Sequence, residues 1–303
     1  MKKILLIGSV TTDVTMRVDH LPGKEEDVNV QEQVLRVGGC AFNASSAVRL
    51  LHVPFTLAYN LGTGVYGEHI AREMEKRGIP VFWRNQRENG SCYCLVEPDG
   101  DRTFLAVHGA EYEFCDEMFA GLCPSDYAIV YISGIDLEDE AGGAVVRCAQ
   151  RMHEAGVQVV FAAGPRIMQV RMERLWDVIH TCPILHVNRG EAQMLARRLG
   201  IMYQSDHDVT KSLQALTHAP VIVTGGPLDV LWCDLSNQVH QVPTVLNDNV
   251  VDGTGAGDCN IGTIMAALVK GRSMHEAITW GNAVSAKVVG KFGGEILPED
   301  FVG

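Results

Sequence analysis

Val251-Asp252-Gly253-Thr254-Gly255-Ala256-Gly257-Asp258 is a glycine-rich turn that leads directly into an amphipathic helix. The helix is predicted from apolar residues at helical spacing: Ile261, Ile264, Met265, Leu268 and Val269. Amides at a helix N-terminus lack intrahelical partners and carry partial positive charge, and glycines let them approach an anion closely. Asp258 is expected in the first turn, ionised at neutral pH by the helix dipole and suited to act as a general base. The simpler interpretation is a favourable first-turn acid.

Outward from this turn, short apolar runs alternate with longer amphipathic segments. The predicted buried strands are 4–7, 55–59, 128–132, 157–162, 184–187 and 221–224. The predicted helices lie near 42–52, 66–77, 139–155, 190–199, 207–217, 256–270 and 273–289. Repeated strand–helix alternation predicts an α/β fold, with a mostly parallel sheet covered by helices on both faces.

Two segments interrupt the alternation. Residues 13–36 contain apolar-rich stretches at 13–18 and 28–34, and residues 91–107 contain two more around a turn at Pro98-Asp99-Gly100. Both are typical of antiparallel hairpins. They predict a small β-sheet lid over a cleft, although hairpins can also extend the edge of the main sheet. No interdomain linker is evident, so residues 1–303 are expected to form a single domain with this lid inserted.

Charge and composition exclude several classes of protein. The net charge is -12, from 25 basic and 37 acidic residues, which argues against nonspecific binding to nucleic acid or to an anionic membrane. The N-terminal apolar run is too short for a signal peptide, and no segment approaches the roughly 20 apolar residues that span a bilayer. Nine scattered cysteines without a Cys-x-x-Cys motif predict free thiols and a cytoplasmic location.

Two further turns offer polar groups. Gly38-Gly39-Cys40-Ala41-Phe42-Asn43 joins a strand to a helix, and the Asn43 amide can donate to and accept from a polyol. Asn188-Arg189-Gly190-Glu191 follows the predicted strand 184–187, at the sheet edge where open α/β sheets bind ligands. Glu191 can hold Mg²⁺ directly or through water. A tight turn in the first case, and an N-cap with a first-turn acid in the second, are the simpler interpretations.

A rival hypothesis comes from Gly62-Thr63-Gly64-Val65-Tyr66-Gly67, which matches G-x-G-x-x-G between a strand and a helix. That context is typical of an NAD(P)-binding oxidoreductase. The pattern also requires an acidic residue at the end of the next strand, about 20 residues on. This region instead reads Arg84-Asn85-Gln86-Arg87-Glu88, and the hypothesis leaves 252–258 unexplained.

Taken together, these segments resemble the ribokinase or PfkB family of carbohydrate kinases over essentially the whole chain. Gly38-Gly39-x-x-x-Asn43 is similar to the first family signature, and 252–258 is similar to the second, D-T-x-G-A-G-D. The remaining similarities are the opening strand followed by Asp13, Asn188-x-x-Glu191 as the N-x-x-E motif, Val223-Thr224-x-Gly226 as the nucleotide-binding strand end, and Asn282-Ala283 on the late helix.

The resemblance implies a three-layer α/β/α sandwich with a β-sheet lid, and transfer of the γ-phosphate of ATP to a hydroxyl, usually a primary one, of a sugar or nucleoside. Asp258 would be the base, and Gly255, Ala256 and Gly257 would form the anion hole. Asp13, Gly38, Gly39 and Asn43 would bind substrate. Thr224, Gly226, Asn282 and Asn188 would bind the nucleotide, with Mg²⁺ at Glu191.

The resemblance also implies a monovalent cation such as K⁺, because the family often uses one near the anion hole. The loop around Asp252 and the tail near 290–294 are the places where it is expected. A sugar-phosphate kinase of the same family is an alternative that needs a cationic site for the second phosphate. Arg102 and Lys24 are candidates, and Arg102 is a candidate substrate-binding residue. Exposed lid edges favour a homodimer through the lid.

Four departures from the family pattern affect the nucleotide pocket and the substrate. Cys259-Asn260 follows the catalytic Asp, where small and aromatic residues are common, and Arg189 stands where Pro is frequent. Gly64 replaces the usual Asp of G-x-D-x-x-G, and the 224–229 strand end lacks the usual second glycine.

Overall fold

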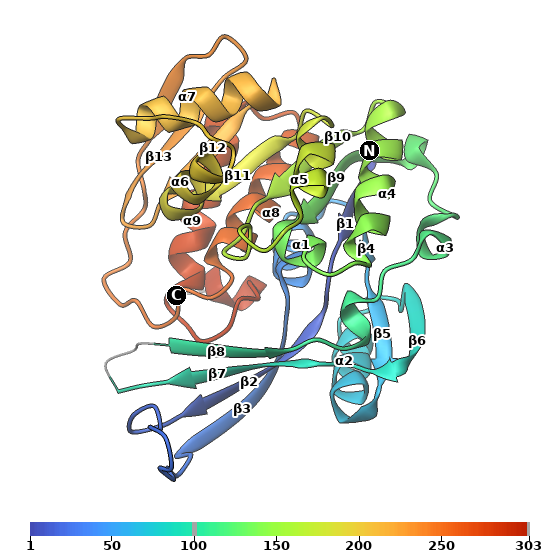
Figure 1. Ribbon diagram of the computed structural model, residues 1–303, viewed down its shortest axis with the longest axis vertical. Helices are drawn as coiled ribbons and strands as arrows, with labels where there is room; N and C mark the ends of the chain where they lie inside the picture. Colours follow the sequence, from blue (N-terminus) through green and yellow to red (C-terminus); the bar gives the residue numbers. More distant parts are fainter. Residues whose placement is uncertain (99–101, 302–303) are drawn as a thin grey trace.

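The computed structural model of the protein describes residues 1–98 and 102–301, and within them a main sheet of eight strands has the order β14-β13-β12-β11-β10-β9-β1-β4 (Figure 1). The strands are β1 (Lys3–Ile7), β4 (Phe55–Ala58), β9 (Tyr127–Ser133), β10 (Gln158–Ala162), β11 (Ile184–Asn188), β12 (Val221–Gly225), β13 (Leu228–Cys233) and β14 (Val239–Val242). Strands β1, β4, β9, β10, β11 and β12 are mutually parallel, which confirms the predicted parallel core. The antiparallel strands β13 and β14 extend one edge and were not predicted.

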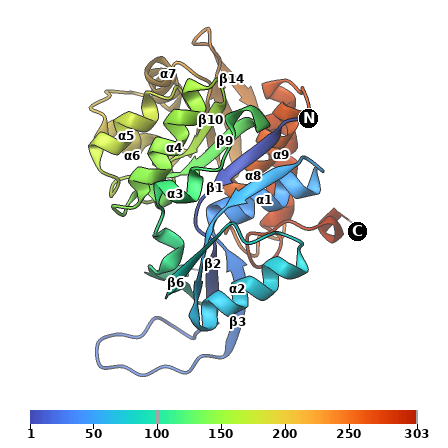
Figure 2. The same cartoon turned by 90° about the vertical axis from the view of Figure 1, so that its right-hand side faces the viewer.

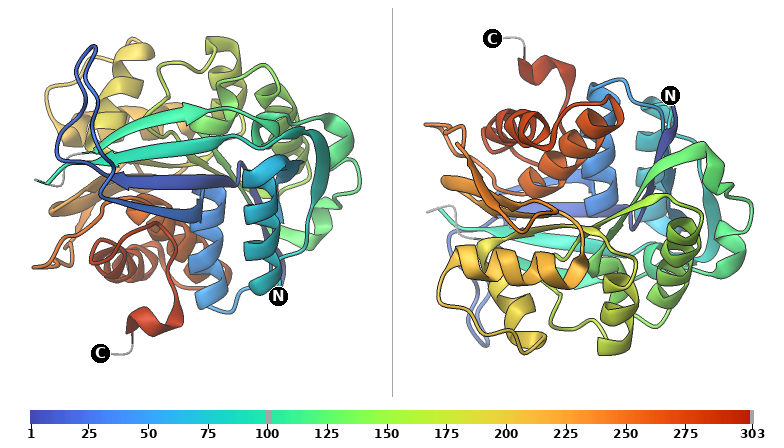
Figure 3. Two further views of the ribbon diagram at one scale, coloured as in Figure 1. Left: turned by 90° about the horizontal axis from the view of Figure 1, so that it is seen from below. Right: turned by 90° about the horizontal axis from the view of Figure 1, so that it is seen from above.

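Helices cover both faces of this sheet, as predicted (Figure 3). One layer contains α1 (Cys40–Leu50), α2 (Gly64–Lys76), α8 (Ala256–Val269) and α9 (Met274–Val288). The other contains α4 (Gly142–Glu154), α5 (Met172–Ile179), α6 (Arg189–Arg198) and α7 (Asp206–Thr217), with the short α3 (Asp116–Phe119) nearby. Strand β1 shows why the run had to be apolar on both sides: Leu5 and Ile7 pack under one layer, and Ile4 and Leu6 under the other.

A second sheet forms the lid below the main sheet (Figures 1 and 2). It contains β2 (Thr11–Arg17), β3 (Glu32–Gly38), β7 (Ser91–Val96) and β8 (Arg102–Val107), in the order β3-β2-β7-β8. Both predicted hairpins are antiparallel, and β2 pairs with β7 in parallel to join them. The hairpins therefore do not extend the main sheet.

Two details of the lid differ from the sequence prediction. Strand β3 begins at Glu32, not at residue 28, and Val28 and Val30 lie in an irregular loop where Val30 is exposed. The alternation of apolar residues there indicated a strand, but Val30 is exposed and Val28 is only half-buried. Asp99 and Gly100 of the predicted turn lie outside the described residues.

A pair of short parallel strands connects the main sheet to the lid. Strand β5 (Asn60–Thr63) follows β4 after one residue and pairs with β6 (Trp83–Glu88). Single turns of 3₁₀ helix occur at Ala110–Tyr112, Pro124–Asp126, Gly134–Leu137 and Pro298–Phe301. The carboxyl ends of the parallel strands, the N-terminus of α8 and the inner face of the lid thus face a common region.

Candidate active site

The loop before α8 is shaped by one glycine that no other residue can replace without strain. Gly255 is the N-cap of α8 and has a φ of 72°, in the left-handed region. A Cβ at this position would lie 2.3 Å from the Cα of Gly294 in the C-terminal tail. The turn therefore needs glycine both for its backbone conformation and for close packing. Open space lies beside the first turn of α8, because a Cβ at Gly257 would meet no atom within 4 Å, and the first amides of a helix have no intrahelical partner.

Asp258 lies in the first turn of α8 and contacts the opposite helix. The Asn43 Nδ2 atom, on α1, donates to Oδ2 of Asp258 at 2.9 Å. Burial raises the pKa of Asp258 to about 6, against the opposing effect of hydrogen bonds from Asn43 and Cys40. Burial was not part of the expectation from the sequence, which considered only the helix dipole. The ionised form still exceeds the protonated form by about ten to one at pH 7, as a base requires.

The lid contributes a second carboxylate to this region. Asp13 on β2 has its Oδ1 atom 3.1 Å from the Thr11 hydroxyl, which donates to it. Burial raises the pKa of Asp13 to about 6, and the negative charges of Asp252 and Asp258 add to the rise. These charge interactions place Asp13 on the same side of the lid as the α8 loop.

The paired glycines of the first motif have separate packing reasons. A Cβ at Gly38 would lie 2.0 Å from Oδ2 of Asp13. Gly39 has a φ of 105° and precedes the first residue of α1, and a Cβ there would lie 2.3 Å from the Ser9 carbonyl oxygen. The motif thus brings Asp13 and Asn43 together at the beginning of α1. Oδ1 of Asn43 is buried without a protein partner, so it remains free to bind a ligand.

Arg102, predicted as a candidate substrate-binding residue, is paired with the loop before α8. Its Nη1 atom is 2.7 Å from Oδ1 of Asp252, and its Nη2 atom donates to the Val251 carbonyl oxygen at 2.7 Å. The guanidinium of this lid residue is therefore bound to the loop that leads into α8.

A cavity of about 520 Å³ opens beside the N-terminus of α8. It is lined by four residues predicted to bind nucleotide: Asn188, Thr224, Gly226 and Asn282. Gly253, Ala256 and Gly257 of the loop and helix line it as well. The side-chain amide of Asn282 is already used, since Nδ2 donates to the Pro243 carbonyl oxygen at 2.8 Å. Asn282 thereby holds the 243–250 segment at the rim of the cavity, which has the size and mixed lining of a small-molecule site.

Glu191 caps the start of α6 together with Asn188, as the simpler interpretation of the sequence expected. Asn188 and Glu191 form a reciprocal capping box at the start of α6, with distances of 2.8 and 3.0 Å. Burial raises the pKa of Glu191, and the charge of Asp258 adds to this rise, so the two carboxylates face the same region. Within residues 1–98 and 102–301, no group of three or more His, Cys, Asp or Glu side chains has the arrangement of a metal site. A metal held here would need ligands from phosphate and water.

Sequence reasoning missed a third buried carboxylate. Asp136 follows β9, and its Oδ1 atom accepts from the Ser9 amide at 2.8 Å, while Oδ2 has no protein partner. Burial raises the pKa of Asp136 to about 6, with a smaller contribution from Asp258. Its position at the carboxyl end of a parallel strand was the signal available.

The G-x-G-x-x-G match at 62–67 is explained by packing. A Cβ at Gly62 would lie 2.4 Å from the Arg87 carbonyl oxygen, and one at Gly67 would lie 2.5 Å from the Gly62 carbonyl oxygen. These glycines bring β5, β6 and α2 into close contact.

No helix in the described part of the chain is long and apolar enough to cross a membrane.

Comparison with known proteins identifies the family of this chain. The pfkB family carbohydrate kinase model matches residues 1–300. An uncharacterized sugar kinase, YegV, from Escherichia coli is 31% identical over 300 residues, covering 98% of this chain and 91% of YegV.

Two solved structures show the same fold. The ribokinase from Thermotoga maritima has a TM-score of 0.84 at 22% identity, and covers 99% of this chain and 98% of its own. The adenosine kinase from Schistosoma mansoni, in complex with 2-fluoroadenosine, has a TM-score of 0.86 at 16% identity and covers 99% of both chains. The chain therefore belongs to the pfkB family of carbohydrate kinases, and it is a phosphotransferase that acts on a sugar or nucleoside.

Proposed function

We propose that the chain transfers the γ-phosphate of ATP to a hydroxyl, normally a primary one, of a free sugar or nucleoside. The observation that carries the proposal is the position of Asp258. Its carboxylate is 2.9 Å from Asn43 on the substrate side, and the same helix turn lines the 520 Å³ cavity on the nucleotide side. A base at this junction can reach both the acceptor hydroxyl and the transferred phosphoryl group.

In the proposed reaction, Asp258 accepts the proton of the acceptor hydroxyl while that oxygen attacks the γ-phosphorus. The bond from the γ-phosphorus to the bridging oxygen breaks, and ADP leaves with the electron pair. The amides of Gly255, Ala256 and Gly257 stabilise the charge on the transferred oxygens, as positioned donors do in phosphoryl transfer. Mg²⁺, when bound with ATP, supplies further positive charge, and Glu191 and Asn188 would hold it through water.

The acceptor is held by the lid and α1 in this proposal. Asp13 accepts hydrogen bonds from sugar hydroxyls, and the free Oδ1 of Asn43 accepts another. Gly38 and Gly39 give the ligand access to the backbone. Closing the lid excludes water, which limits the transfer of phosphate to water.

The paired state of nearby arginines favours an unphosphorylated acceptor. Arg102 is bound to Asp252 and Val251, and Arg166 is bound to Glu138 at 2.7 Å. A second phosphate bound by either of these arginines would have to displace its partner.

Arg36, opposite Asp13 in the β2–β3 register, makes none of the ion pairs found within the described residues and is a position that could hold such a phosphate. A sugar-phosphate kinase is therefore the second candidate, and the substrate panel described below tests it.

We also infer a cytoplasmic homodimer that pairs through the lid. Leu35, Leu105 and Val107 alternate onto one face of the lid sheet and are exposed, with Leu105 and Val107 more than half exposed. Leu105 and Val107 are neighbours on the edge strand β8, and Leu35 lies on the same face of the other edge strand, β3. Exposed apolar side chains along an open sheet edge favour pairing with a second copy. All nine cysteines are unpaired, which fits a reducing compartment. Light scattering after size-exclusion chromatography tests the dimer, and Leu105→Glu should convert it to a monomer.

The experiment that tests the function is coupled ADP release with Mg²⁺-ATP against free pentoses, hexoses, nucleosides and their monophosphates. Asp258→Asn is the inactive control, and Asp177→Asn, at an exposed position on α5, is the matched active control. Turnover of a free compound that only Asp258→Asn abolishes supports the proposal. Turnover of monophosphates alone replaces it with the sugar-phosphate alternative. A folded protein that binds no ATP contradicts both.

A further inference from the structure

The family resemblance places a monovalent cation near the loop around Asp252 and the tail near 290–294, and the Asp252 carboxylate between them is already bound by N–H donors. Its Oδ1 atom is 2.7 Å from Nη1 of Arg102 and accepts from the Thr254 amide at 2.7 Å. Its Oδ2 atom accepts from the Gly293 amide at 2.9 Å. The side chain is only 9% exposed. Three donors take up three of the roughly four acceptor positions of the carboxylate. One of these donors is a guanidinium, so a cation bound to the same carboxylate would lie beside a like charge, and the residues present do not fit K⁺.

Nearby backbone oxygens are used in the same way. The Val251 carbonyl oxygen accepts from Nη2 of Arg102 at 2.7 Å. The Val289 carbonyl oxygen accepts from the amides of Val251 and Asp252 at 2.7 and 3.1 Å. One guanidinium therefore contacts both a carboxylate and a carbonyl oxygen, which are the two kinds of ligand that a hard monovalent cation prefers.

We propose that the Arg102 guanidinium takes the place of the monovalent cation, so that this kinase organises its anion-hole loop without K⁺. Arg102 is then a positioning residue: it acts on Gly255–Gly257 through Asp252 and Val251. The inference concerns the loop to which the proposed function assigns the anion hole, and it rests on that assignment. A planar guanidinium with fixed donors suits a bidentate contact of this kind better than lysine does.

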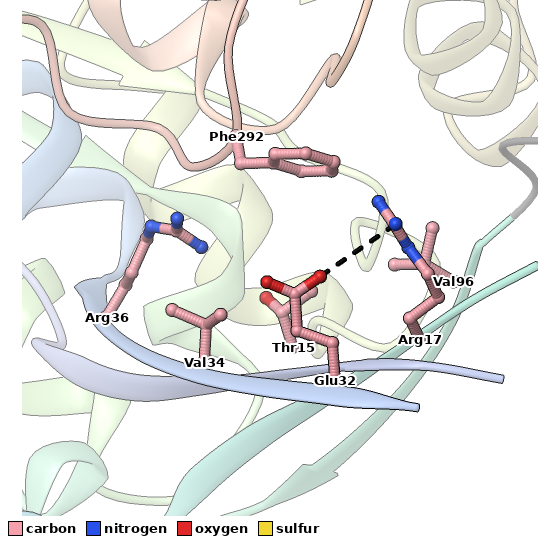
Figure 4. A pocket seen from close by; sticks show the side chains of 7 residues that line it. All are labelled: Thr15, Arg17, Glu32, Val34, Arg36, Val96 and Phe292. Atoms are coloured by element: carbon pink, nitrogen blue, oxygen red, sulfur yellow. Dashed lines mark ion pairs between the residues drawn. The ribbon is translucent and has the colours of Figure 1, made fainter. Parts of the chain in front are cut away.

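The position of Arg102 couples the lid to the loop before α8. Arg102 is the first residue of β8, so the charge that neutralises Asp252 comes from the lid. The C-terminal tail is packed against the lid too: Phe292 lies over the side chains of Arg17 and Thr15 (Figure 4), with its ring 5.9 Å from the Arg17 guanidinium carbon. Gly293 lies against Arg36, where a Cβ would be 2.9 Å from Cδ of that arginine. Movement of the lid would therefore disturb the loop from two sides.

The first test measures activity at constant ionic strength, with tetramethylammonium chloride replaced stepwise by KCl or NaCl. The wild type should change less than about twofold. Arg102→Met keeps the length of the side chain but removes the charge, and it should lose at least about tenfold in kcat. K⁺ should restore part of that loss. Arg147→Met, which breaks a surface pair with Asp116, is the matched control and should behave as the wild type.

The second test does not depend on turnover. The melting temperature of Arg102→Met should rise by at least about 2 °C when K⁺ replaces tetramethylammonium, because an ion that binds only the folded state stabilises it. The wild type and Asp258→Asn should show no such rise. Severalfold activation of the wild type by K⁺, or an Arg102→Met enzyme that ignores every cation in both tests, would overturn the inference. Because Asp258→Asn is inactive but retains Arg102, failure of the proposed function and failure of this inference give different results.

Discussion

Different kinds of residue surround Asp258 on its nucleotide side and on its acceptor side. On the nucleotide side, the cavity is lined by uncharged residues: glycines such as Gly226, polar side chains such as Thr224 and Asn282, and apolar side chains such as Val230 and Leu246. On the acceptor side, Asp13, Asp136 and Asp258 are buried close enough together that the charge of Asp258 adds to the rise in the pKa of each of the other two. The nucleotide side therefore depends on shape, whereas the acceptor side depends on the balance of charge. Changes on the two sides should affect the enzyme in different ways.

Replacing Asp258 with Asn should have the largest effect. The amide keeps the size of the side chain but cannot accept the proton, and loss of a general base lowers kcat by about 10²- to 10⁴-fold. ATP affinity should remain within a few-fold of the wild type, because the nucleotide cavity is unchanged. Single-turnover kinetics and calorimetric ATP titration check this prediction. An equal loss of ATP affinity would show that the two sides are not separable.

Two glycine-to-alanine substitutions compare a left-handed glycine that is closely packed with one that faces open space. Gly255→Ala would force a side chain into a left-handed position and against Gly294, and should destabilise the protein by more than about 2 kcal/mol. Gly226→Ala has a similar φ of 61° but no atom within 4 Å of the added Cβ, so it should cost about 1 kcal/mol. Urea unfolding of both variants measures the difference. Equal losses would contradict the assigned role of Gly294.

The pH dependence of the rate reports the acceptor side. With the pKa of Asp258 raised to about 6, kcat/KM should be level above pH 7 and fall toward a tenfold loss per unit below pH 6. Asp13, with a pKa also near 6, should steepen that fall if it must be ionised to bind substrate. A pH–rate profile between pH 4.5 and 9 tests this. A midpoint near 4 would show that Asp258 is not desolvated.

The last prediction concerns the pH dependence of stability. The pKa of Asp136 is raised in the folded state to about 6, so the stabilisation that it contributes is present below about pH 4 and is lost as pH rises through 6. Asp136→Asn cannot titrate and should lack this loss. The free energy of unfolding of the variant relative to the wild type should improve by up to about 2 kcal/mol between pH 4.5 and 7.5. Parallel profiles for the two proteins in urea would contradict the prediction, and Asp177→Asn serves as the exposed control.

The same contrast explains what could be read from the sequence. The parallel strands were predictable because each is apolar on both faces, as in the run from Ile4 to Ile7. Strands β13 and β14 were missed because polar or exposed residues interrupt their apolar pattern, such as Leu228 and Asp229 in β13 and His240 and Gln241 in the edge strand β14. The glycine turn before α8 was visible because φ and close packing leave no other choice at Gly255.

Contacts between residues far apart in the sequence could not be predicted, because they produce no local sequence pattern. Arg102 and Val251 are 149 positions apart, and nothing near Arg102 indicated that it would bind the loop. Asp136 stands alone after its strand, so no spacing identified it. The shifted start of β3 shows the reverse error, because alternating valines at 28 and 30 indicated a strand where Val30 is exposed and Val28 is only half-buried.

The hydrogen bond between Asn43 and Asp258 joins residues 215 positions apart. During synthesis, the acceptor side would therefore remain incomplete until α8 had left the ribosome, long after the lid and α1 had been made. Long-range closure of this kind is slow relative to the formation of helices and hairpins. Activity recovered after dilution from denaturant should consequently lag behind the return of secondary structure, and fragments that end before residue 256 should show none.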